Sequence, residues 1–443
     1  MSAKEEFIEI YRENIRRDGA DALLDYLEHK SDFFTAPASA RFHGAYAGGL
    51  CEHSVNVYHC LTAYLERERV KELYGLEYPA ESVALVSLLH DVCKTGCYRQ
   101  GSRNVKGPDG KFELVTVGVA QNATAENGGH AYAFNAPKAF GRSFSMQKGF
   151  DPRVDGYLYG WNFQEQWSRA FELDPQIVFV TGWNEFTAGQ HENWPPTKPH
   201  KPFAFPDQYD WNCSRDIEPN AGWGDKGDVY YLQLVDNVRK FKGMNAPEKA
   251  SAPKTVKIGK ADGWDDVAPY FASYKGNTMH RRHKGYGGNV YENNSGRNDI
   301  VGAKVARDAD NVYFYVETAD KLTPATDRNW MMLFIDVDRD KTTGWNGYDF
   351  IVNRTSPHGK KAVIEKNVGG RWEWEAVGES KFAVNGNKLE LAIAKQLMNL
   401  TGDDVDIEFK WNDNMQENGN IMDFYVNGDT APGGRFNYVY TAK

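Results

Sequence analysis

Apolar positions in the first hundred residues recur at helical spacing. In the stretch FIEIYRENI, which begins at Phe7, apolar side chains return every three or four positions and so share one face of an amphipathic helix. Two further helices are expected over Leu50–Tyr64 and Ser82–His90, and the second is apolar enough to be buried. This pattern predicts an all-α domain over residues 1–114.

From Val115 onward the pattern changes to short apolar strands that alternate with helices. VTVGVA, PQIVFVTGWNEF and PFAFPDQYDW are each expected to form a strand, while residues 157–173 and the stretch DVYYLQLVDNVRKFKG are expected to form amphipathic helices. A strand, a polar loop and a helix in series are typical of a parallel α/β barrel. We therefore expect residues 115–244 to be part of a (β/α) barrel.

The last part of the chain has the alternation of an all-β domain. Residues 245–255, NAPEKASAPKT, lack apolar periodicity and are expected to be a linker. Beyond them come seven alternating segments separated by Gly, Asn and Asp turns: NVYFYVET, WMMLFIDVD, YDFIVNR, KAVIEKN, KLELAIA, VDIEFKWND and FNYVYTA. Residues 256–443 are expected to form a β-sandwich. The predicted fold class is thus multidomain: an all-α segment, a partial (β/α) barrel and an all-β sandwich.

Composition adds limits on partners and a hint about origin. The 443 residues carry a net charge of −9, which argues against nucleic acid or an anionic membrane as a partner. No apolar run is long enough for a membrane span, and the polar helical start is unlike a signal peptide, so a cytoplasmic location is expected. All 12 Trp lie at or after Trp161. Such an uneven distribution suggests that the two halves have different origins.

Histidine and aspartate residues in the first domain have the pattern of a metal site. His53 lies within one predicted helix, and the adjacent pair His90 and Asp91 ends another. Imidazole and carboxylate ligands from separate helices can converge on a divalent metal and leave positions for water and phosphate. We predict a divalent metal site here, with the identity of the metal open. The alternative is that these histidines pack or cap helices.

The first 114 residues resemble the HD-domain phosphohydrolases, in particular their small bacterial members. The resemblance lies in the stretches FHGAYAGGLCEHS, ERERVKELYGLEY and LLHDVCK. It implies that His53, His90 and Asp91 are metal ligands and that Lys94 contacts a substrate phosphate or the aspartate. The family also takes a ligand from a later helix, where this chain offers only Asp109 in a turn. We therefore expect a truncated domain with three ligands.

A second constellation surrounds Glu185, at the end of the expected strand in IVFVTGWNEF. The carboxyl ends of barrel strands carry catalytic residues, and glycoside hydrolysis usually requires two carboxylates. Asp207 and Asp210 are the local candidates for the second carboxylate; the alternative for Glu185 is a structural acid at a strand end. Asn and aromatic side chains nearby are candidates for binding sugar: Trp183, Asn184, His130, Tyr132, His191, Trp194 and Trp211.

Residues 116–243 resemble the C-terminal portion of a TIM-barrel glycoside hydrolase with a GWNEW-type motif. The supporting stretches are VGVAQNATAENGGHAYAFNAP, YGWNFQEQWSRAFE, VTGWNEFTAGQHENW and DQYDWNCSRDIEP. By this resemblance Glu185 supplies one catalytic carboxylate, and its partner would normally lie on an earlier strand. Only about three of the eight β/α units of a barrel are present. Both an active and an inactive hydrolase are therefore left open.

A third constellation follows a predicted strand of the sandwich. Asp336, Asp338 and Asp340 alternate before Gly344, a spacing that can fold around Ca²⁺, although Gly347 stands where an EF-hand has glutamate. A polar turn is the alternative.

Residues 256–443 resemble family 9-like carbohydrate-binding modules, which implies a polysaccharide or oligosaccharide partner. The tryptophans that could stack on sugar rings, or instead fill the core, are Trp330, Trp345, Trp372 and Trp374.

Three functions are thus expected. The leading one is a carbohydrate-active protein, glycoside hydrolase-like with a glycan-binding sandwich and fused to a truncated HD domain. The alternatives are a metal-dependent HD phosphohydrolase and a non-catalytic carbohydrate-binding protein. Because both resemblances break off near residues 113–118, we expect a chimera, formed by gene fusion or in sequence assembly. The glycosidase-like part suggests a secreted origin, in contrast to the location expected from the N-terminus.

Overall fold

The computed structural model divides the chain into two compact units, Met1–Gly110 and Lys111–Lys443. It describes residues 2–40, 42–98, 110–122, 133–136, 139–184, 190–192, 203–260, 263–278 and 280–443. The division lies close to the junction expected at 113–118. Each unit is described below by itself.

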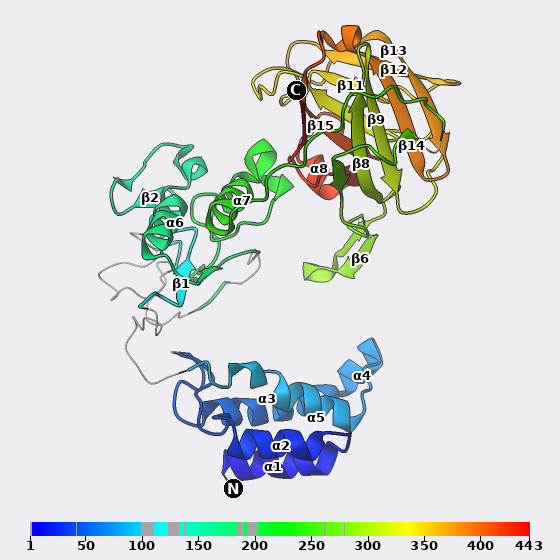
Figure 1. Ribbon diagram of the computed structural model, residues 1–443. Coiled ribbons are helices and arrows are strands. Elements are labelled where there is room, and N and C mark those ends of the chain that lie inside the picture. The colour runs from blue at the N-terminus through cyan, green and yellow to red at the C-terminus, as the bar shows by residue number, and fades with distance from the viewer. Residues whose placement is uncertain are drawn as a thin grey trace. The chain divides into compact units, whose positions relative to one another are not determined.

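The first unit, called here the helical unit, contains the expected helices (Figure 1). These are α1 (Ala3–Asn14), α2 (Ala20–His29), α3 (Gly49–Leu65), α4 (Glu68–Tyr74), α5 (Ala80–Leu89) and the 3₁₀ turn η1 (Val92–Lys94). A capping box between Ser2 and Glu5 begins α1. Helix α3 packs against both α1 and α5. Their shared core includes Phe7, Leu24, Leu27, Phe33, Leu50, Val55, Ala84 and Leu88.

Residues 111–244, called here the β/α part, begin the second unit. Their elements are β1 (Leu114–Val117), β2 (Phe144–Ser145), β3 (Gly149–Phe150), η3 (Gly156–Tyr159), α6 (Trp161–Leu173), β4 (Ile177–Val180), η4 (Ala221–Lys226) and α7 (Val229–Lys242). Strands β1 and β4 pair in parallel. The core on this pair includes Val117, Val119, Phe163, Trp167, Ala170, Ile217 and Tyr230.

A barrel is not shown in the described residues of the β/α part. They contain one parallel strand pair, β1 with β4. The prediction that PFAFPDQYDW forms a strand is wrong for its described residues. Residues 203–211 form only isolated bridges, such as the one between Ala204 and His191. Alternation in this stretch is interrupted by prolines, and its polar groups bond to neighbouring loops instead of a sheet.

Residues 256–443, called here the β part, form an antiparallel sheet of eleven strands that curls on itself (Figure 1). The strands are β5 (Tyr270–Ala272), β8 (Ile300–Arg307), β9 (Asn311–Thr318), β10 (Met332–Asp336), β11 (Phe350–Val352), β12 (Lys361–Asn367), β13 (Trp374–Asn385), β14 (Lys388–Ala394), β15 (Val405–Asp413), β16 (Asp429–Ala431) and β17 (Tyr438–Ala442). Curling brings distant strands together, so that Phe314 of β9 lies 5.7 Å from Phe409 of β15 between ring centroids. The remaining elements are the hairpin β6 (Arg281–Lys284) and β7 (Val290–Asn293), with η6 (Tyr286–Gly288), η7 (Lys395–Met398) and α8 (Asp423–Val426).

All seven segments expected to be strands in the β part contain one. The strands that were not identified from the sequence are β5, β6, β7, β8, β13 and β16. Strand β13 is mostly exposed, so its apolar pattern is weak, and pairing with β12 and β14 defines it. Part of the expected linker is bonded to strand β8, because Lys254 donates its backbone N–H to the carbonyl of Arg307. Among the described residues, no helix combines the length and apolarity needed to cross a membrane.

Candidate metal centre

Three chain segments of the helical unit bring the candidate metal ligands together. His53 lies on α3, one turn after its start, while His90 caps the C-terminus of α5 and Asp91 follows it. His43 lies in the loop that leads into α3. This loop approaches α3 closely because Gly44 takes a positive φ of 59° and a side chain at Gly49 would collide with the backbone of Gly44.

The donor atoms of His53, His90 and Asp91 form a nearly equilateral triangle. His53 Nε2 lies 3.2 Å from His90 Nε2 and 3.4 Å from Asp91 Oδ2, and His90 Nε2 lies 3.3 Å from the same oxygen. His90 is oriented by its other ring nitrogen, which lies 2.7 Å from the carbonyl oxygen of Ser87. The three side chains therefore point to one place from two helices.

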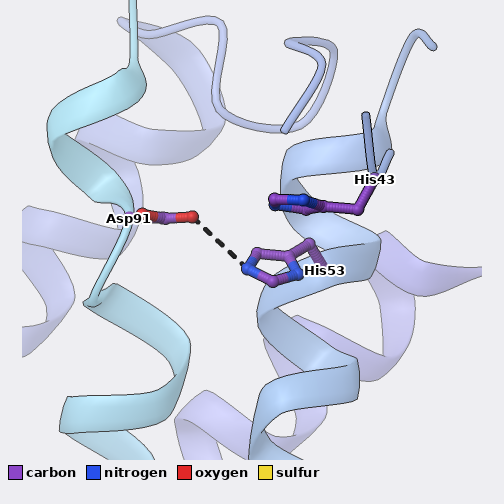
Figure 2. A group of neighbouring side chains, drawn as sticks. All are labelled: His43, His53 and Asp91. Carbon is purple, nitrogen blue, oxygen red and sulfur yellow. Dashed lines mark ion pairs between the residues drawn. The ribbon is translucent and has the colours of Figure 1, made fainter. Parts of the chain in front are cut away.

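His43 adds a fourth donor that reasoning from the sequence missed. Its ring centroid lies 4.5 Å from that of His53. His43, His53 and Asp91 each offer a ligand atom, and these atoms lie within 4.8 Å of one another (Figure 2). The only signal in the sequence was its place in FHGAYAGGLCEHS, ten residues before His53. Asp109, the later aspartate considered from the sequence, lies outside the described residues.

These donors fit a divalent transition metal. Zinc binds nitrogen and oxygen ligands at about 2.0–2.2 Å in a tetrahedral arrangement, which places ligand atoms about 3.3 Å apart. The sides of the triangle, 3.2, 3.3 and 3.4 Å, agree with that spacing. Mixed imidazole and carboxylate donors are the set that Zn²⁺, Fe²⁺ and similar ions accept.

The charges at this cluster favour the ligand forms of its side chains. Burial, with the charges of His43 and His90, lowers the pKa of His53, which favours its neutral imidazole. Burial alone would raise the pKa of Asp91, but a hydrogen bond from Lys94 and the neighbouring histidines lower it. Lys94 Nζ lies 2.7 Å from Asp91 Oδ2 and donates to the carbonyl of Ala38 at 3.0 Å. Lys94 therefore contacts the aspartate.

Of the three carboxylates expected to catalyse glycoside hydrolysis, the structure describes Asp207 and Asp210. Glu185 lies outside the described residues, as do His130, Tyr132 and Trp194. Asp207 is buried and forms an ion pair with Arg215. One oxygen of Asp210, Oδ1, accepts the backbone N–H of Cys213 at 2.6 Å. Each of these two carboxylates therefore bonds to a residue of its own loop.

An open groove in the second unit contains one of the residues expected to bind sugar. Trp183 is 45% exposed and borders a cavity of about 540 Å³ between the β/α part and the β part. Asn184 is exposed beside it. Trp211, also expected to bind sugar, lies elsewhere, with its ring centroid 6.2 Å from that of Trp223. The other groove residues used below, not identified from the sequence, are Glu218, Tyr231, Arg239, Tyr274, Arg281 and Phe436.

The carboxylates that the structure groups in the β part differ from those expected to bind calcium. Asp336 and Asp338 approach Asp349, not Asp340. Asp340 is excluded because its Oδ1 accepts the backbone N–H of Thr342 at 2.8 Å within the turn. Lys341 Nζ lies 2.6 Å from Asp336 Oδ2, so an ammonium group already compensates the buried carboxylate.

Two of the tryptophans expected to stack on sugars are buried instead. Trp330 is 1% exposed and Trp345 is 3% exposed, so neither ring presents a face to solvent. Of the two alternatives left open by the sequence, these burial values favour core packing for both rings, which belong to the hydrophobic clusters of the curled sheet. Trp372 and Trp374 are partly buried, and Trp372 lies edge-on to Trp345 with centroids 4.5 Å apart.

No family model, curated protein or solved structure matches this chain.

Proposed function

We propose that the helical unit binds a divalent metal ion and hydrolyses a phosphate ester at that site. The observation that carries the proposal is the triangle of His53 Nε2, His90 Nε2 and Asp91 Oδ2, with sides of 3.2–3.4 Å. His43 stands beside this triangle and is accessible to solvent.

The residues around the cluster have separate roles in this proposal. A bound divalent ion supplies Lewis acidity and lowers the pKa of a water molecule. His53, His90 and Asp91 would hold the ion. The ammonium of Lys94, 2.7 Å from Asp91, places a positive charge where a phosphate can bind. His43 lies on the exposed side, where it can hydrogen-bond a phosphate oxygen or complete the ligand set.

Metal binding is tested by titrating the full chain with Co²⁺ and recording the visible absorption of the bound ion. We expect one ion per chain, and His53→Ala to lower the affinity by about tenfold to hundredfold or more. The matched control is His59→Ala, because His59 lies on the same helix but pairs with Glu6, at 2.7 Å. Equal affinity of the two variants would contradict the site.

Hydrolysis is tested on the metal-loaded full chain with p-nitrophenyl phosphate and a panel of nucleoside monophosphates. We expect phosphate release that Asp91→Asn abolishes and His59→Ala preserves. Binding of Co²⁺ without release of phosphate from any ester would leave a metal site but reject the hydrolase.

A second candidate function is carbohydrate binding by the second unit, favoured by the exposed ring of Trp183 at the groove. The engagement of Asp207 and Asp210 within their loop favours binding without hydrolysis. Calorimetric titration with neutral and acidic oligosaccharides tests it. Trp183→Ala should weaken binding about tenfold, while Trp211→Ala, a tryptophan of similar exposure outside the groove, should not.

A further inference from the structure

The groove in the second unit has walls from two different parts of the chain. One wall comes from the β/α part and includes Trp183, Glu218 and Arg239. The other comes from the β part and includes Tyr274 and Arg281. Because neither part forms this groove alone, its composition is a property of the assembled unit.

A buried ion pair joins the two walls. Asp228, whose side chain is fully buried, accepts hydrogen bonds from Arg435 Nε at 2.6 Å and Nη2 at 2.8 Å. The hydroxyl of Tyr425 donates to the same carboxylate at 2.9 Å. Beside this pair, the Tyr231 ring lies 5.9 Å from the Phe436 ring between centroids. A bidentate, buried pair with an added hydrogen bond holds the two parts in one geometry.

The groove carries an excess of positive charge. Arg239 and Arg281 line it, and neither guanidinium forms an ion pair or hydrogen bond within the described part of the chain. Among the described residues that line the groove, Glu218 is the single acidic one. The chain as a whole carries a net charge of −9, so two unpaired arginines in one groove run against its general charge. A guanidinium binds carboxylate and sulfate groups through paired hydrogen bonds.

The same groove presents aromatic rings and polar groups suited to sugar. Trp183 is 45% exposed and Tyr274 is 87% exposed, so both rings have accessible faces. The groove continues into a smaller cavity of about 200 Å³ that shares Arg281 with it. Asn, Ser and Thr residues line much of this cavity, including Asn277, Thr278, Asn293 and Thr430. Such groups match the hydroxyls of a saccharide, whereas the rings match its apolar faces.

We propose that this groove binds an anionic oligosaccharide, one that carries uronate carboxylates or sulfate groups. Arg239 and Arg281 receive the anionic groups from opposite walls, and Trp183 stacks on a sugar ring between them. This inference rests on the candidate carbohydrate-binding function and specifies its ligand class.

The test is calorimetric titration of the full chain with an oligogalacturonate hexamer, a sulfated heparin hexasaccharide and maltohexaose as the neutral probe. We expect an anionic probe to bind at least about tenfold more tightly than maltohexaose. Arg239→Gln and Arg281→Gln should each remove about tenfold of that affinity without changing the affinity for maltohexaose.

Arg282→Gln is the matched control, because Arg282 is the neighbour of Arg281 on β6 but pairs with Glu292, at 3.6 Å. If Arg282→Gln lost as much affinity as Arg281→Gln, the effect would come from the net charge of the chain and not from the groove. That result would overturn the inference. Maltohexaose bound as tightly as the acidic probes would also overturn it, while leaving carbohydrate binding intact. Binding of ATP in preference to every saccharide, or no binding of any saccharide, would reject both the inference and the carbohydrate function.

Discussion

The described residues contain two candidate metal clusters that differ in how their charge is balanced. In the helical unit, Asp91 lies among imidazoles, with His53 Nε2 and His90 Nε2 3.4 and 3.3 Å from its Oδ2. In the β part, Asp336 lies among other carboxylates, near Asp338 and Asp349. Each aspartate also contacts a lysine ammonium, at 2.7 Å for Asp91 and 2.6 Å for Asp336.

The difference shows what a neighbouring lysine does in each cluster. Asp336 is fully buried, and an isolated buried carboxylate is costly, so we expect Lys341 to stabilise the folded β part. The same ammonium group also pairs with Glu408, so it is shared by two carboxylates. At Asp91, Lys94 contacts the carboxylate. The imidazole nitrogens of His53 and His90 still offer their lone pairs to a cation. We therefore expect lysine removal to damage the β part and to strengthen metal binding in the helical unit.

The largest expected effect is on the stability of the β part. Lys341→Gln leaves Asp336 without its cation and should lower the free energy of unfolding by about 1–3 kcal/mol. Urea unfolding followed by tryptophan fluorescence measures this, because every tryptophan of the chain lies in the second unit. The matched variant Lys94→Gln, in the helical unit, should leave this transition unchanged. An unchanged transition in Lys341→Gln would contradict the structural role of that lysine.

The same substitution sharpens the contrast between the clusters. When Lys341 is removed, no lysine ammonium offsets the negative charges of Asp336, Asp338 and Asp349. Added Ca²⁺ should therefore recover part of the lost stability. The original chain should gain less stability from Ca²⁺, because the Lys341 ammonium group already offsets the charge of Asp336. Thermal unfolding with and without Ca²⁺ distinguishes these outcomes, and equal gains would show that the turn does not bind the ion.

A smaller effect is expected at the metal cluster of the helical unit. Lys94→Gln removes a positive charge 2.7 Å from Asp91 Oδ2 and should raise the affinity for Co²⁺ by about tenfold. It should also slow phosphate release from p-nitrophenyl phosphate, since the ammonium is proposed to bind the phosphate. Weaker Co²⁺ binding by this variant would show that Lys94 mainly positions Asp91.

The smallest effects concern pH, and they have opposite signs in the two units. The pKa of Glu81 in the helical unit is lowered, mainly by a hydrogen bond from the backbone N–H of Arg16. A hydrogen bond from the side chain of Arg17 is the second largest cause. A lowered folded-state pKa contributes stability above the ordinary value, about 4.3, which is lost as the pH falls through the folded value. Circular dichroism melting at acidic pH should show this loss, and Glu81→Gln should reduce it.

At alkaline pH the β part is the sensitive one. Burial alone would lower the pKa of Lys341, but its hydrogen bonds to Asp336 and Glu408 raise it above the ordinary value. Its contribution to stability is complete below the ordinary value, about 10.4, and is lost as the pH rises through the folded value. Fluorescence-detected melting should therefore decline less steeply with rising pH in Lys341→Gln than in the original chain.

Elements with a strong local pattern could be predicted from the sequence, whereas those defined by their neighbours could not. Helix α3 and strand β9 carry their periodicity in their own residues. Strand β13 is mostly exposed, and the stretch 203–211 bonds to loops, so local pattern failed for both. The sequence also predicted that His53, within one helix, comes together with His90 and Asp91, at the end of another.

By itself, the sequence determined the helical character of the first unit, seven strands of the last 190 residues or so and three donors of the candidate metal cluster. Only the tertiary structure decided that His43 lies beside them, because the approach of a loop to α3 depends on Gly44 and Gly49. It also placed Lys341 on Asp336 and brought Arg239 and Arg281 to one groove. These arrangements join residues far apart in the chain, and their energies depend on burial and distance, which local sequence patterns do not encode.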